Sequence, residues 1–376
     1  MSSFTTIEDV CDLVTDGTHY TPKNVGLGIP FLTVKDVTDV ELDFTNCSFI
    51  SDADYQIAKL GNSAPQKGDV LFSKDGTVGK VHIVNTDKPF AVLSSLAILR
   101  PNKKLIESQY LGNVLRLPLV LDDALKRKTG SAIRRIILAD LKRVRFPLPS
   151  LEEQRRIAEI LDRAEELRSK RREAIAQLDT LTQAIFIEMF GNPVTNAMGW
   201  EIQPFGKLVI NKDSKRKPVK EENRTKQEKI YPYYGAIGII DYVDHFLFEG
   251  TNLLIEEDGM NLVTRNKPIA LIAQGKYWVN NHAHVVCEKE KINLNYLCHY
   301  LNYQDISNFV TGIDQKKLNR TNLDQIPVIL PPLPLQREFA KRVEAVEKLK
   351  AAHRATLSEF DALFYSLQHR AFRGEL

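Results

Sequence analysis

Five histidine and cysteine side chains crowd one stretch of 18 residues and could, by residue type, bind a metal ion. They are His282, His284, Cys287, Cys298 and His299. On a strand, His282 and His284 would point to one face and Cys287 to the other, and no CxxC pair accompanies them. This spacing argues against a structural metal. His282 and His284, next to WVNN, are instead candidates for polar groups on a strand or loop edge that contact bases or phosphates.

A glycine-containing segment imitates a phosphate-binding loop. In GTVGKV, from Gly76 to Val81, the two glycines are three positions apart instead of five, and Val81 replaces the required Ser or Thr. The sequence also lacks the GxSxG, HExxH and GxGxxG motifs. We therefore expect no cofactor and no catalytic residues in this chain, which argues against a self-sufficient modifying enzyme.

The chain contains an internal repeat, which decides how all other features are placed. Aligning Thr129-Gly130 with Thr311-Gly312 superposes residues 129–190 on 311–372 without a gap, with 15 identities in 62 positions. The identical pairs include Leu148 with Leu330, Pro149 with Pro331, Leu151 with Leu333, Gln154 with Gln336, Arg155 with Arg337 and Phe190 with Phe372. We expect two copies of one module, each a globular part followed by a long helix.

Two segments are strongly basic. Residues 126–145 hold eight cations and one anion, and residues 212–229 hold eight cations and four anions. Solvated faces and nucleic-acid contacts both produce such runs. The cationic pair Arg134-Arg135 aligns with Lys316-Lys317 although the surrounding sequence has diverged, which favours phosphate contacts.

Heptad spacing predicts that the two long helices pair as a coiled coil. In the first copy the a positions are Ile157, Ala164, Leu178 and Ile185, and the d positions are Ile160, Leu167, Ala174 and Leu181. In the second copy the a positions are Phe339, Val346, Phe360 and Leu367, with Leu349 and Leu363 at d. Arg171 and His353 are equivalent polar exceptions that would fix the register.

Local signals mark the ends of the first helix. Ser150 with Glu153 forms a capping-box pattern, and Gly191 with the following Asn192-Pro193 ends the helix. The second helix starts at PPLPLQ without a capping box. The alternative is an amphipathic helix that packs on its own globular part.

The globular parts contain short β-type runs bounded by turns. The runs are IPFLTV, GDVLFS, VGKVHIV and FAVLSSLAIL in the first part, and KIYPYYG, NLLIEE, PIALIA and HAHVVC in the second. Short helical patterns, QYLGNVLRL and NYLCHYLN, follow the last strands. We expect an α+β protein in which two mixed α/β domains are joined by two long antiparallel coiled-coil helices. The domain boundaries are 1–147, 148–191, 192–329 and 330–376.

Length and composition are those of a protein with buried cores. The chain has 376 residues, of which 43% are hydrophobic and 26% are charged, with a net charge of +3. Its longest apolar stretch, Phe90 to Leu99, is far shorter than the ~20 residues of a membrane span. The N-terminus lacks a signal-peptide pattern, and the four cysteines are irregularly spaced. We expect a cytoplasmic protein with reduced cysteines.

Taken together, these features resemble the specificity subunit of a type I restriction-modification system. The resemblance covers the whole chain. It is carried by the repeat, by TGSAIRRI and PLPSLEEQRRIAEIL with the copy PPLPLQREFAKRVE, and by DGTHYTPK, GIPFLTVKDV, GDVLFSKDGTVGK, FGNPVTNAMGW, GKYWVNNHAHVV and RAFRGEL.

The resemblance implies two target recognition domains, each of which contacts one half of a bipartite double-stranded DNA site. It also implies that this subunit is not catalytic and directs partners that are. These partners are a methyltransferase subunit, usually in two copies, that methylates adenine with S-adenosylmethionine, and a restriction subunit that translocates and cuts DNA with ATP. The conserved helices would dock the methyltransferase. A coiled-coil scaffold without DNA specificity is the alternative.

The candidate DNA-contacting residues are polar or cationic side chains on turns and strand ends. In the first domain they are Lys74, Asp75, Gly76, Thr77, Lys80, Arg134 and Arg135. In the second they are Tyr233, Tyr234, Lys276, Asn281, His282, His284, Lys316 and Lys317. Lysines and arginines would mainly hold phosphates, and Asn, His and Tyr would contact base edges. The alternative is that Tyr233 and Tyr234 are core aromatics and that Lys74 is a turn lysine.

Replacing Arg134 with alanine should weaken binding to all DNA sequences and flatten the salt dependence of the affinity, because a phosphate contact carries no sequence information. Titrations of two unrelated duplexes at several salt concentrations measure both effects. A change in base preference alone would contradict the phosphate assignment.

Overall fold

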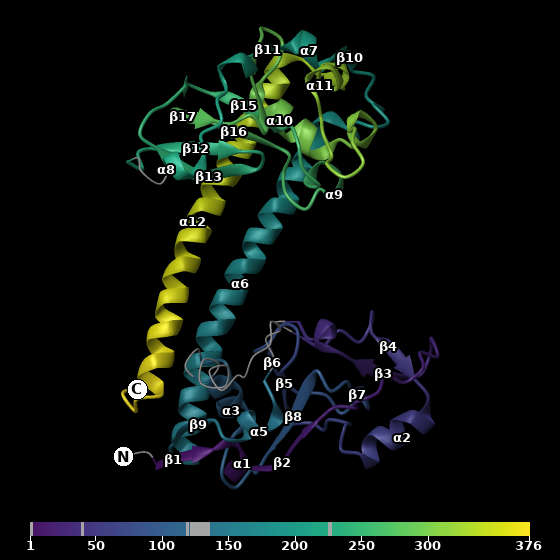
Figure 1. Cartoon of the computed structure of the whole chain (residues 1–376), viewed down its shortest axis with the longest axis vertical. Coiled ribbons are helices and arrows are strands. Elements are labelled where there is room, and N and C mark those ends of the chain that lie inside the picture. Colours follow the sequence, from purple (N-terminus) through teal and green to yellow (C-terminus); the bar gives the residue numbers. More distant parts are fainter. Residues whose placement is uncertain (1–2, 39–40, 118–119, 121–135, 225–227) are drawn as a thin grey trace. The chain divides into compact units, whose positions relative to one another are not determined.

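In the computed structural model, the described residues are 3–38, 41–117, 120, 136–224 and 228–376. They form two compact units, one made of residues 1–171 with 356–376 and the other of residues 172–355. Each unit is a mixed α/β part that holds one segment of each of two long helices (Figure 1). No helix in the described ranges is long and apolar enough to cross a bilayer.

The first unit is built on a four-stranded antiparallel sheet of order β2-β8-β5-β6. Its strands are β2 (Cys11–Asp16), β8 (Leu96–Pro101), β5 (Val70–Ser73) and β6 (Val81–Ile83). A three-stranded sheet contains β4 (Ser48–Ile50), β3 (Ile29–Leu32) and β7 (Ala91–Val92), and a two-stranded sheet pairs β1 (Ser3–Thr6) with β9 (Arg145–Leu148). The helices are α1 (Ile7–Val10), η1 (Val34–Asp36), α2 (Asp52–Leu60), α3 (Ser108–Leu115) and α5 (Leu138–Lys142).

The second unit has a four-stranded antiparallel sheet of order β11-β18-β15-β16. Its strands are β11 (Val209–Asn211), β18 (Ala283–Glu288), β15 (Asn252–Glu256) and β16 (Ala270–Ala273). The sheet β13-β12-β17-β14 consists of β13 (Gly238–Val243), β12 (Tyr231–Gly235), β17 (Lys276–Val279) and β14 (Phe248–Glu249), and β10 (Glu201–Pro204) pairs with β19 (Pro327–Leu330). The short helices are α7 (Phe205–Leu208), η2 (Asp213–Lys215), α8 (Glu221–Arg224), α9 (Asn261–Thr264), α10 (Leu294–Tyr303), η3 (Ser307–Phe309) and α11 (Arg320–Gln325).

The two globular parts repeat one topology. The order β2-β8-β5-β6 matches β11-β18-β15-β16, the pair β1-β9 matches β10-β19, and the parallel pair β3-β7 matches β12-β17. All eight predicted β-type runs contribute strands, and the two predicted short helices are α3 and α10. The repeat found in the helices therefore extends through the globular parts, where the strand order has been kept and the sequence has diverged.

The central strands explain why these runs are almost continuously apolar. All four residues of β5 and all five of β15 are buried. A strand covered on both faces has no solvent side, so its sequence does not alternate. The short helices α3 and α10 pack their buried residues into the same cores as these strands.

The long helices are α6 (Leu151–Phe190) and α12 (Leu333–Ala371). The Ser150 hydroxyl accepts a hydrogen bond from the Glu153 amide at 3.3 Å, and Gly191 follows α6 with a positive φ of 76°. The bond to Ser150 caps the start of α6, and Gly191, in the left-handed conformation, ends the helix. Both predicted helix ends are confirmed.

The face on which the helices pack differs from the predicted seam. The predicted a positions face inward, but Leu167, Leu181, Leu349 and Leu363 at d are 37–52% exposed. The buried partners of the a positions are instead the e positions, among them Leu161, Val343 and Phe364. Because a/d and a/e seams both repeat on average every 3.5 residues, spacing alone could not distinguish them.

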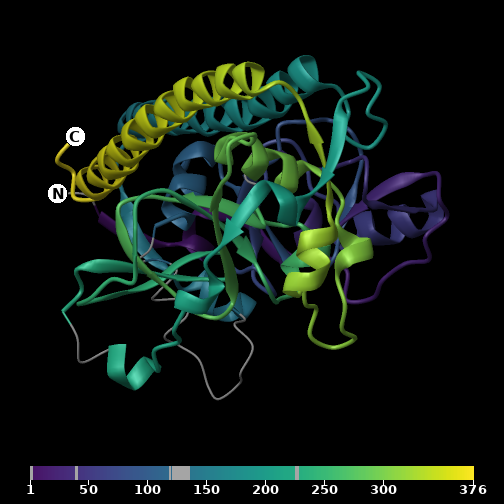
Figure 2. The same cartoon turned by 90° about the horizontal axis from the view of Figure 1, so that it is seen from above.

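Within each unit the segments of α6 and α12 are antiparallel, because residues earlier in α6 contact residues later in α12. In the first unit Arg168 reaches Asp361, and Arg171 lies over the ring of Phe360 at 5.8 Å. In the second unit Lys350 reaches Asp179 at 2.8 Å. Figures 1 and 2 show the last turns of α12 beside the first turns of α6, where Arg156 donates to the carbonyl of Leu376.

These charged contacts form two equivalent ion clusters. Arg168 pairs with Asp361 and with Glu165, while Lys350 pairs with Asp179 and with Glu347. Each member is 182 residues from its counterpart, and the two cations are only 11% and 6% exposed. Removing the carboxylates would leave a nearly buried charge unpaired, so both clusters favour one register of the helix pair.

A buried glutamine fixes the start of each long helix to its globular part. The Gln154 amide nitrogen donates to the carbonyls of Leu105 and Pro149, and its oxygen accepts from the Glu107 amide at 2.9 Å. The equivalent Gln336 donates to Lys291 and Pro331 and accepts from Asn293 at 2.9 Å. Both side chains are fully buried. This shared role explains why glutamine occurs at both positions.

A phenylalanine fixes the other end of each helix. Phe372, which follows α12, packs on Tyr110 of α3, and Phe190 at the end of α6 packs on Tyr296 of α10. The Tyr110 hydroxyl donates to the Pro147 carbonyl, and the Tyr296 hydroxyl donates to that of Ile329. Each unit thus holds the start of one long helix and the end of the other.

Replacing Gln154 with leucine should lower the free energy of unfolding by about 3 kcal/mol, because it leaves buried backbone groups unpaired at about 1–3 kcal/mol each. Urea unfolding followed by circular dichroism measures the change. The control is Arg155→Ala, which removes an exposed ion pair with Glu107 and should change stability by less than about 1 kcal/mol. Equal effects of the two variants would contradict this role for the glutamine.

Candidate nucleic-acid interface

The turn after β5 carries most of the residues predicted to contact DNA in the first unit. Lys74 is 1% exposed, and its amine lies 3.2 Å from Asp16 and 3.9 Å from Asp75. A buried, ion-paired lysine is not placed to hold a phosphate, so Lys74 has a structural role here. This corrects the sequence-based assignment of Lys74, whose partner Asp16 lies on a separate strand.

The rest of this turn is tightly folded, and only its tip is exposed. The Ser73 hydroxyl donates to the Thr77 carbonyl and accepts from the Lys80 amide. The Lys80 amine donates to the carbonyls of Val37 at 2.5 Å and Val34 at 3.4 Å, which attaches the turn to η1. Gly76 and Thr77 are exposed and Asp75 is half-buried. Of the predicted residues in this turn, Gly76 and Thr77 remain the ones presented to solvent.

The basic pair Arg134-Arg135 lies outside the described residues. The next residue, Ile136, is buried, and its amide donates to the Lys74 carbonyl at 2.9 Å. In the second unit Leu318, which follows Lys316-Lys317, donates in the same way to the Glu257 carbonyl at 2.7 Å. The residue after the basic pair is therefore joined to the turn after β5 or β15 in both units.

In the second unit the turn after β15 gathers four of the predicted residues. The Glu257 amide donates to the His282 carbonyl, and the Gly259 amide donates to the Lys316 carbonyl. Lys317 pairs with Glu257 at 3.2 Å, and Asn281 is exposed beside His282. Asn281, His282, Lys316 and Lys317 thus come together at one site, although they lie on two separate segments.

A buried charge cluster supports this site. His284 is 1% exposed, with Nδ1 2.7 Å from Asp213 and Nε2 2.8 Å from the Leu318 carbonyl. Both ring nitrogens therefore face hydrogen-bond acceptors. Arg216 completes the cluster by pairing with Glu257 at 2.6 Å. His284 was predicted to contact DNA, but its burial gives it a structural role.

The cluster shifts the pKa of both of its carboxyl groups. Burial raises the pKa of Asp213, but hydrogen bonds from His284 and the Val285 amide outweigh this effect and lower it to about 2. Burial also raises the pKa of Glu257, yet the bond from Arg216 and the neighbouring positive charges leave it below its ordinary value. Both groups are therefore ionised at neutral pH.

Tyr233, Tyr234 and Lys276, which were predicted to contact DNA, differ in how far they are exposed to solvent. Tyr233 is 1% exposed, and its hydroxyl accepts from the Val219 amide, so it is a core aromatic and not a base contact. Tyr234 is half-buried against Tyr277. Lys276 is exposed, with its amine 4.8 Å from the ring centre of Phe246. Only Lys276 of these three presents a charge to solvent.

The basic segment 212–229 is divided between internal and exposed cations. Lys212 bonds to Asn252, while Arg224 and Lys229 pair with Asp241. Lys215, Lys217 and Lys220 are exposed. The segment also joins the loop site, because the Lys217 amide donates to the Val279 carbonyl and the Trp278 indole donates to the Lys217 carbonyl. Exposed lysines therefore flank the strand that leads to Asn281.

The cysteine and histidine stretch is not arranged as a metal centre. Cys298 and His299 lie on α10, where burial raises the pKa of the thiol to about 12 and lowers the pKa of the imidazole to about 4. Within the described ranges, no three His, Cys, Asp or Glu side chains are grouped so that they could hold a metal ion.

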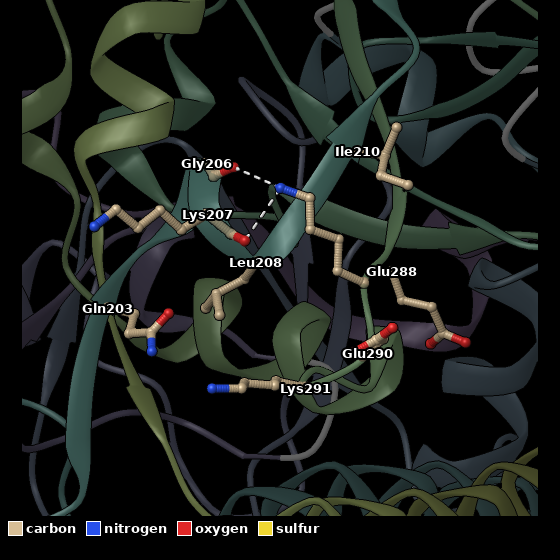
Figure 3. A pocket seen from close by; sticks show the side chains of 9 residues that line it. Gln203, Gly206, Lys207, Leu208, Ile210, Glu288, Glu290 and Lys291 are labelled. Atoms are coloured by element: carbon tan, nitrogen blue, oxygen red, sulfur yellow. Dashed lines mark hydrogen bonds between the residues drawn. The ribbon is translucent and has the colours of Figure 1, made fainter.

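A groove lies at the other end of β18 from His282. It has a volume of about 810 Å³ and is lined by residues 203, 206–208, 210 and 288–291. The Lys289 amine donates to the carbonyls of Gly206 and Lys207 at 3.5 and 3.2 Å. Figure 3 shows the residues that line the groove and marks these two bonds at Gly206 and Lys207 with dashed lines. The Lys289 amine is therefore held by backbone carbonyls and is not free to bind a ligand in the groove.

The sequence did not identify the acidic residues that support the site. Asp213, Glu257 and Asp258 pair with His284, Arg216 and His282, and none of the three is among the predicted site residues. Asp258 could have been found from the sequence, because Asp258-Gly259 resembles Asp75-Gly76. In the structure these two pairs follow the equivalent buried strands β15 and β5.

The fold and site define a class: a duplicated α/β protein with polar loops and two shared long helices. The family model described as “Type I restriction modification DNA specificity domain” matches residues 2–177 and 199–359. The chain belongs to this family.

Relatives and solved structures agree with this assignment. A Haemophilus influenzae protein named “Putative type I restriction enzyme specificity subunit” is 40% identical over 149 residues, which cover 40% of this chain and 38% of that protein. The “Putative type I restriction enzyme MjaX specificity subunit” of Methanocaldococcus jannaschii is 25% identical over 371 residues, or 91% of this chain and 86% of the relative. The crystal structure of the type I system S subunit from M. genitalium has a TM-score of 0.61 at 17% identity and covers 99% of this chain and 96% of that one, which shows a shared fold.

Replacing Asp213 with asparagine should remove a contribution to stability that depends on pH. Because the pKa of this carboxyl is lowered to about 2 from about 3.9 in an unfolded chain, its contribution is fully present above about pH 5 and is lost as the pH falls toward 2. The difference in unfolding free energy between wild type and variant should therefore shrink over that range in urea titrations. The control Asp314→Asn, in an exposed loop, should show a constant difference, and a constant difference for Asp213→Asn would contradict the assignment.

Proposed function

We propose that this protein is the DNA-recognition subunit of a type I restriction-modification complex. It binds a bipartite, asymmetric site in double-stranded DNA, with one globular part on each half. It directs a methyltransferase subunit, in two copies, and a restriction and translocation subunit to that site. Family membership and the duplicated polar loops are the observations that carry this proposal.

The loop sites support sequence-specific binding more than a scaffold role. The cations around the second site are the exposed Lys215, Lys217 and Lys317 and the half-buried Lys316, and they can hold phosphates. Asn281 and His282 offer groups that bond to base edges. A scaffold would need neither feature. Because the two units present different residues at equivalent turns, the two half-sites should differ in sequence.

The helices support a spacer role. At 1.5 Å per residue the 40 residues of α6 span about 60 Å, comparable with about 17 base pairs of B-DNA. Paired as a coiled coil, the helices would set the number of bases between the half-sites, for which about one helical turn of DNA is expected.

The outward faces of the helices support docking of paired partner subunits. Leu167 is equivalent to Leu349 and Leu181 to Leu363, and all four are 37–52% exposed. Exposed leucines that recur at equivalent positions of both helices are available for contact with another protein. Two equivalent sets suit two copies of one partner, as expected for the methyltransferase.

Expression of the chain with its methyltransferase subunit, in a host without adenine methylation, tests the proposal. Mapping of modified adenines should give one bipartite motif, and replacing either globular part should change only one half of it. A stable complex that methylates no DNA, together with a chain that shows no salt-dependent DNA affinity, would favour the scaffold.

Adding one helical turn to both long helices tests the spacer. The insertions belong between residues 168 and 179 and between residues 350 and 361, so that both ion clusters still form. The same methylation map should show unchanged half-sites with a longer gap. An unchanged gap would contradict the role of the helices as a ruler.

A further inference from the structure

The loop that contains Lys316 and Lys317 has an almost fully exposed isoleucine at its tip. Ile313 is 91% exposed, and it lies between Thr311 and Lys317, which pair with each other as an antiparallel bridge. Turn tips are usually occupied by Gly, Pro, Asn, Asp or Ser. A bulky β-branched side chain at this tip adds nothing to the buried core, and such departures from local preference are expected at functional sites.

The backbone of this loop is closed by its own hydrogen bonds. The amides of Thr311 and Lys317 each donate to the carbonyl of the other at 2.8 Å. Gly312 has a φ of 90°, and a Cβ there would lie 2.0 Å from the carbonyl oxygen of Gln315, so the loop requires glycine at this position. The Lys316 amine donates to the Gly312 carbonyl at 2.9 Å. The tip is therefore presented from a closed base.

A second exposed apolar side chain lies on the neighbouring turn. The Gly259 amide donates to the Lys316 carbonyl at 2.9 Å, which joins the turn after β15 to the base of the loop. Met260, the next residue, is 53% exposed. In the sequence of the other copy, the residues aligned with Met260 and Ile313 are Thr77 and Ser131. The second copy therefore has two apolar side chains where the first copy has hydroxyl groups.

The charges of the loop favour contact between its tip and the DNA bases. Lys316 and Lys317 lie at the base of the loop and can hold phosphates, whereas Asp314 lies at the tip. Phosphates repel a carboxylate, but base amino groups donate hydrogen bonds to it. The tip stands two residues beyond the bridge, at most about 7 Å in an extended chain, and the grooves of B-DNA are about 7.5–8.5 Å deep. With its side chain, Ile313 can therefore reach the base stack.

We propose that Ile313 is an apolar wedge that inserts between adjacent base pairs of the half-site bound by the second globular part. Met260 covers the opened base step from the neighbouring turn. Insertion costs the stacking energy of one step, and burial of the apolar side chains together with the contacts that a bent duplex gains offsets this cost. The inference rests on the proposed function, and it gives one half-site a distortion that the other lacks.

The fluorescence of 2-aminopurine tests the wedge, because this adenine analogue is quenched while it is stacked and brightens when its base step opens. The methylation map supplies the motif and assigns each half to a globular part. A set of duplexes then carries one 2-aminopurine at successive positions of both halves. With the full chain at saturation and no methyltransferase subunit, fluorescence should rise at one or two adjacent positions of the second half and nowhere in the first.

Three variants separate the wedge from loss of structure and from loss of charge. Ile313→Ser should abolish the rise, whereas Ile313→Leu should keep it, because leucine has a similar volume. Ile313→Ser should unfold at the same urea concentration as the wild type and keep its salt dependence of binding, because the side chain is exposed and uncharged. The control Val194→Ser removes another β-branched side chain, 70% exposed, between α6 and β10, and should leave the rise unchanged.

Contact with a thymine methyl group in the major groove is the other use that DNA offers for an exposed apolar side chain. Single replacements of thymine by uracil in the second half remove this methyl group. If Ile313 is a wedge, each replacement changes the affinity of the wild type and of Ile313→Ser by the same factor. A loss at one thymine in the wild type that Ile313→Ser does not show would overturn the proposal.

Two further results would overturn the wedge and leave the proposed function in place. One is a fluorescence rise that persists in Ile313→Ser. The other is a bound wild-type complex that shows no rise at any position of the second half. Absence of DNA affinity in the wild type at every salt concentration would instead overturn the proposed function, and this inference with it.

Discussion

A single buried amide at the start of each long helix joins the helix to its globular part. Gln154 and Gln336 each bond to three backbone groups that come from two separate segments. Both glutamine side chains are fully buried, so an apolar replacement would leave these backbone groups without their partner. Each glutamine therefore ties the first turn of a long helix to the segment that precedes it and to the loop before α3 or α10.

The helix pair shows how a repeated sequence can specify a unique arrangement. Arg168 and Lys350 are nearly buried, and each needs one carboxylate from its own helix and one from the other. Shifting either helix by one turn would leave a cation without its partner on the other helix. Apolar packing at positions a and e supplies affinity between the helices, and the ion clusters supply register.

The sequence could predict the elements better than the surfaces. Periodicity marked α6 from Leu151 to Phe190, and turn signals marked the strands, because both are local properties of the chain. It could not show that Lys74, Tyr233 and His284 are buried. Their partners are distant in sequence: Asp213, for example, is 71 residues from His284. Likewise, the heptad pattern located an apolar helix face but not the side that meets the neighbouring helix, which left the exposed leucines unpredicted.

The two globular parts place opposite charges at one equivalent position. Lys74 follows β5 and is neutralised by Asp16, whereas Glu257 follows β15 and is neutralised by Arg216 and Lys317. If either loop alone were moved into the other copy, its charge would meet partners of the same sign. A lysine would face Arg216 and Lys317, and a glutamate would face Asp16. The charged residue of each loop and its partners on other segments therefore depend on one another as a set. A change of charge at this position therefore needs a matching change at its partners if the charge is to stay paired.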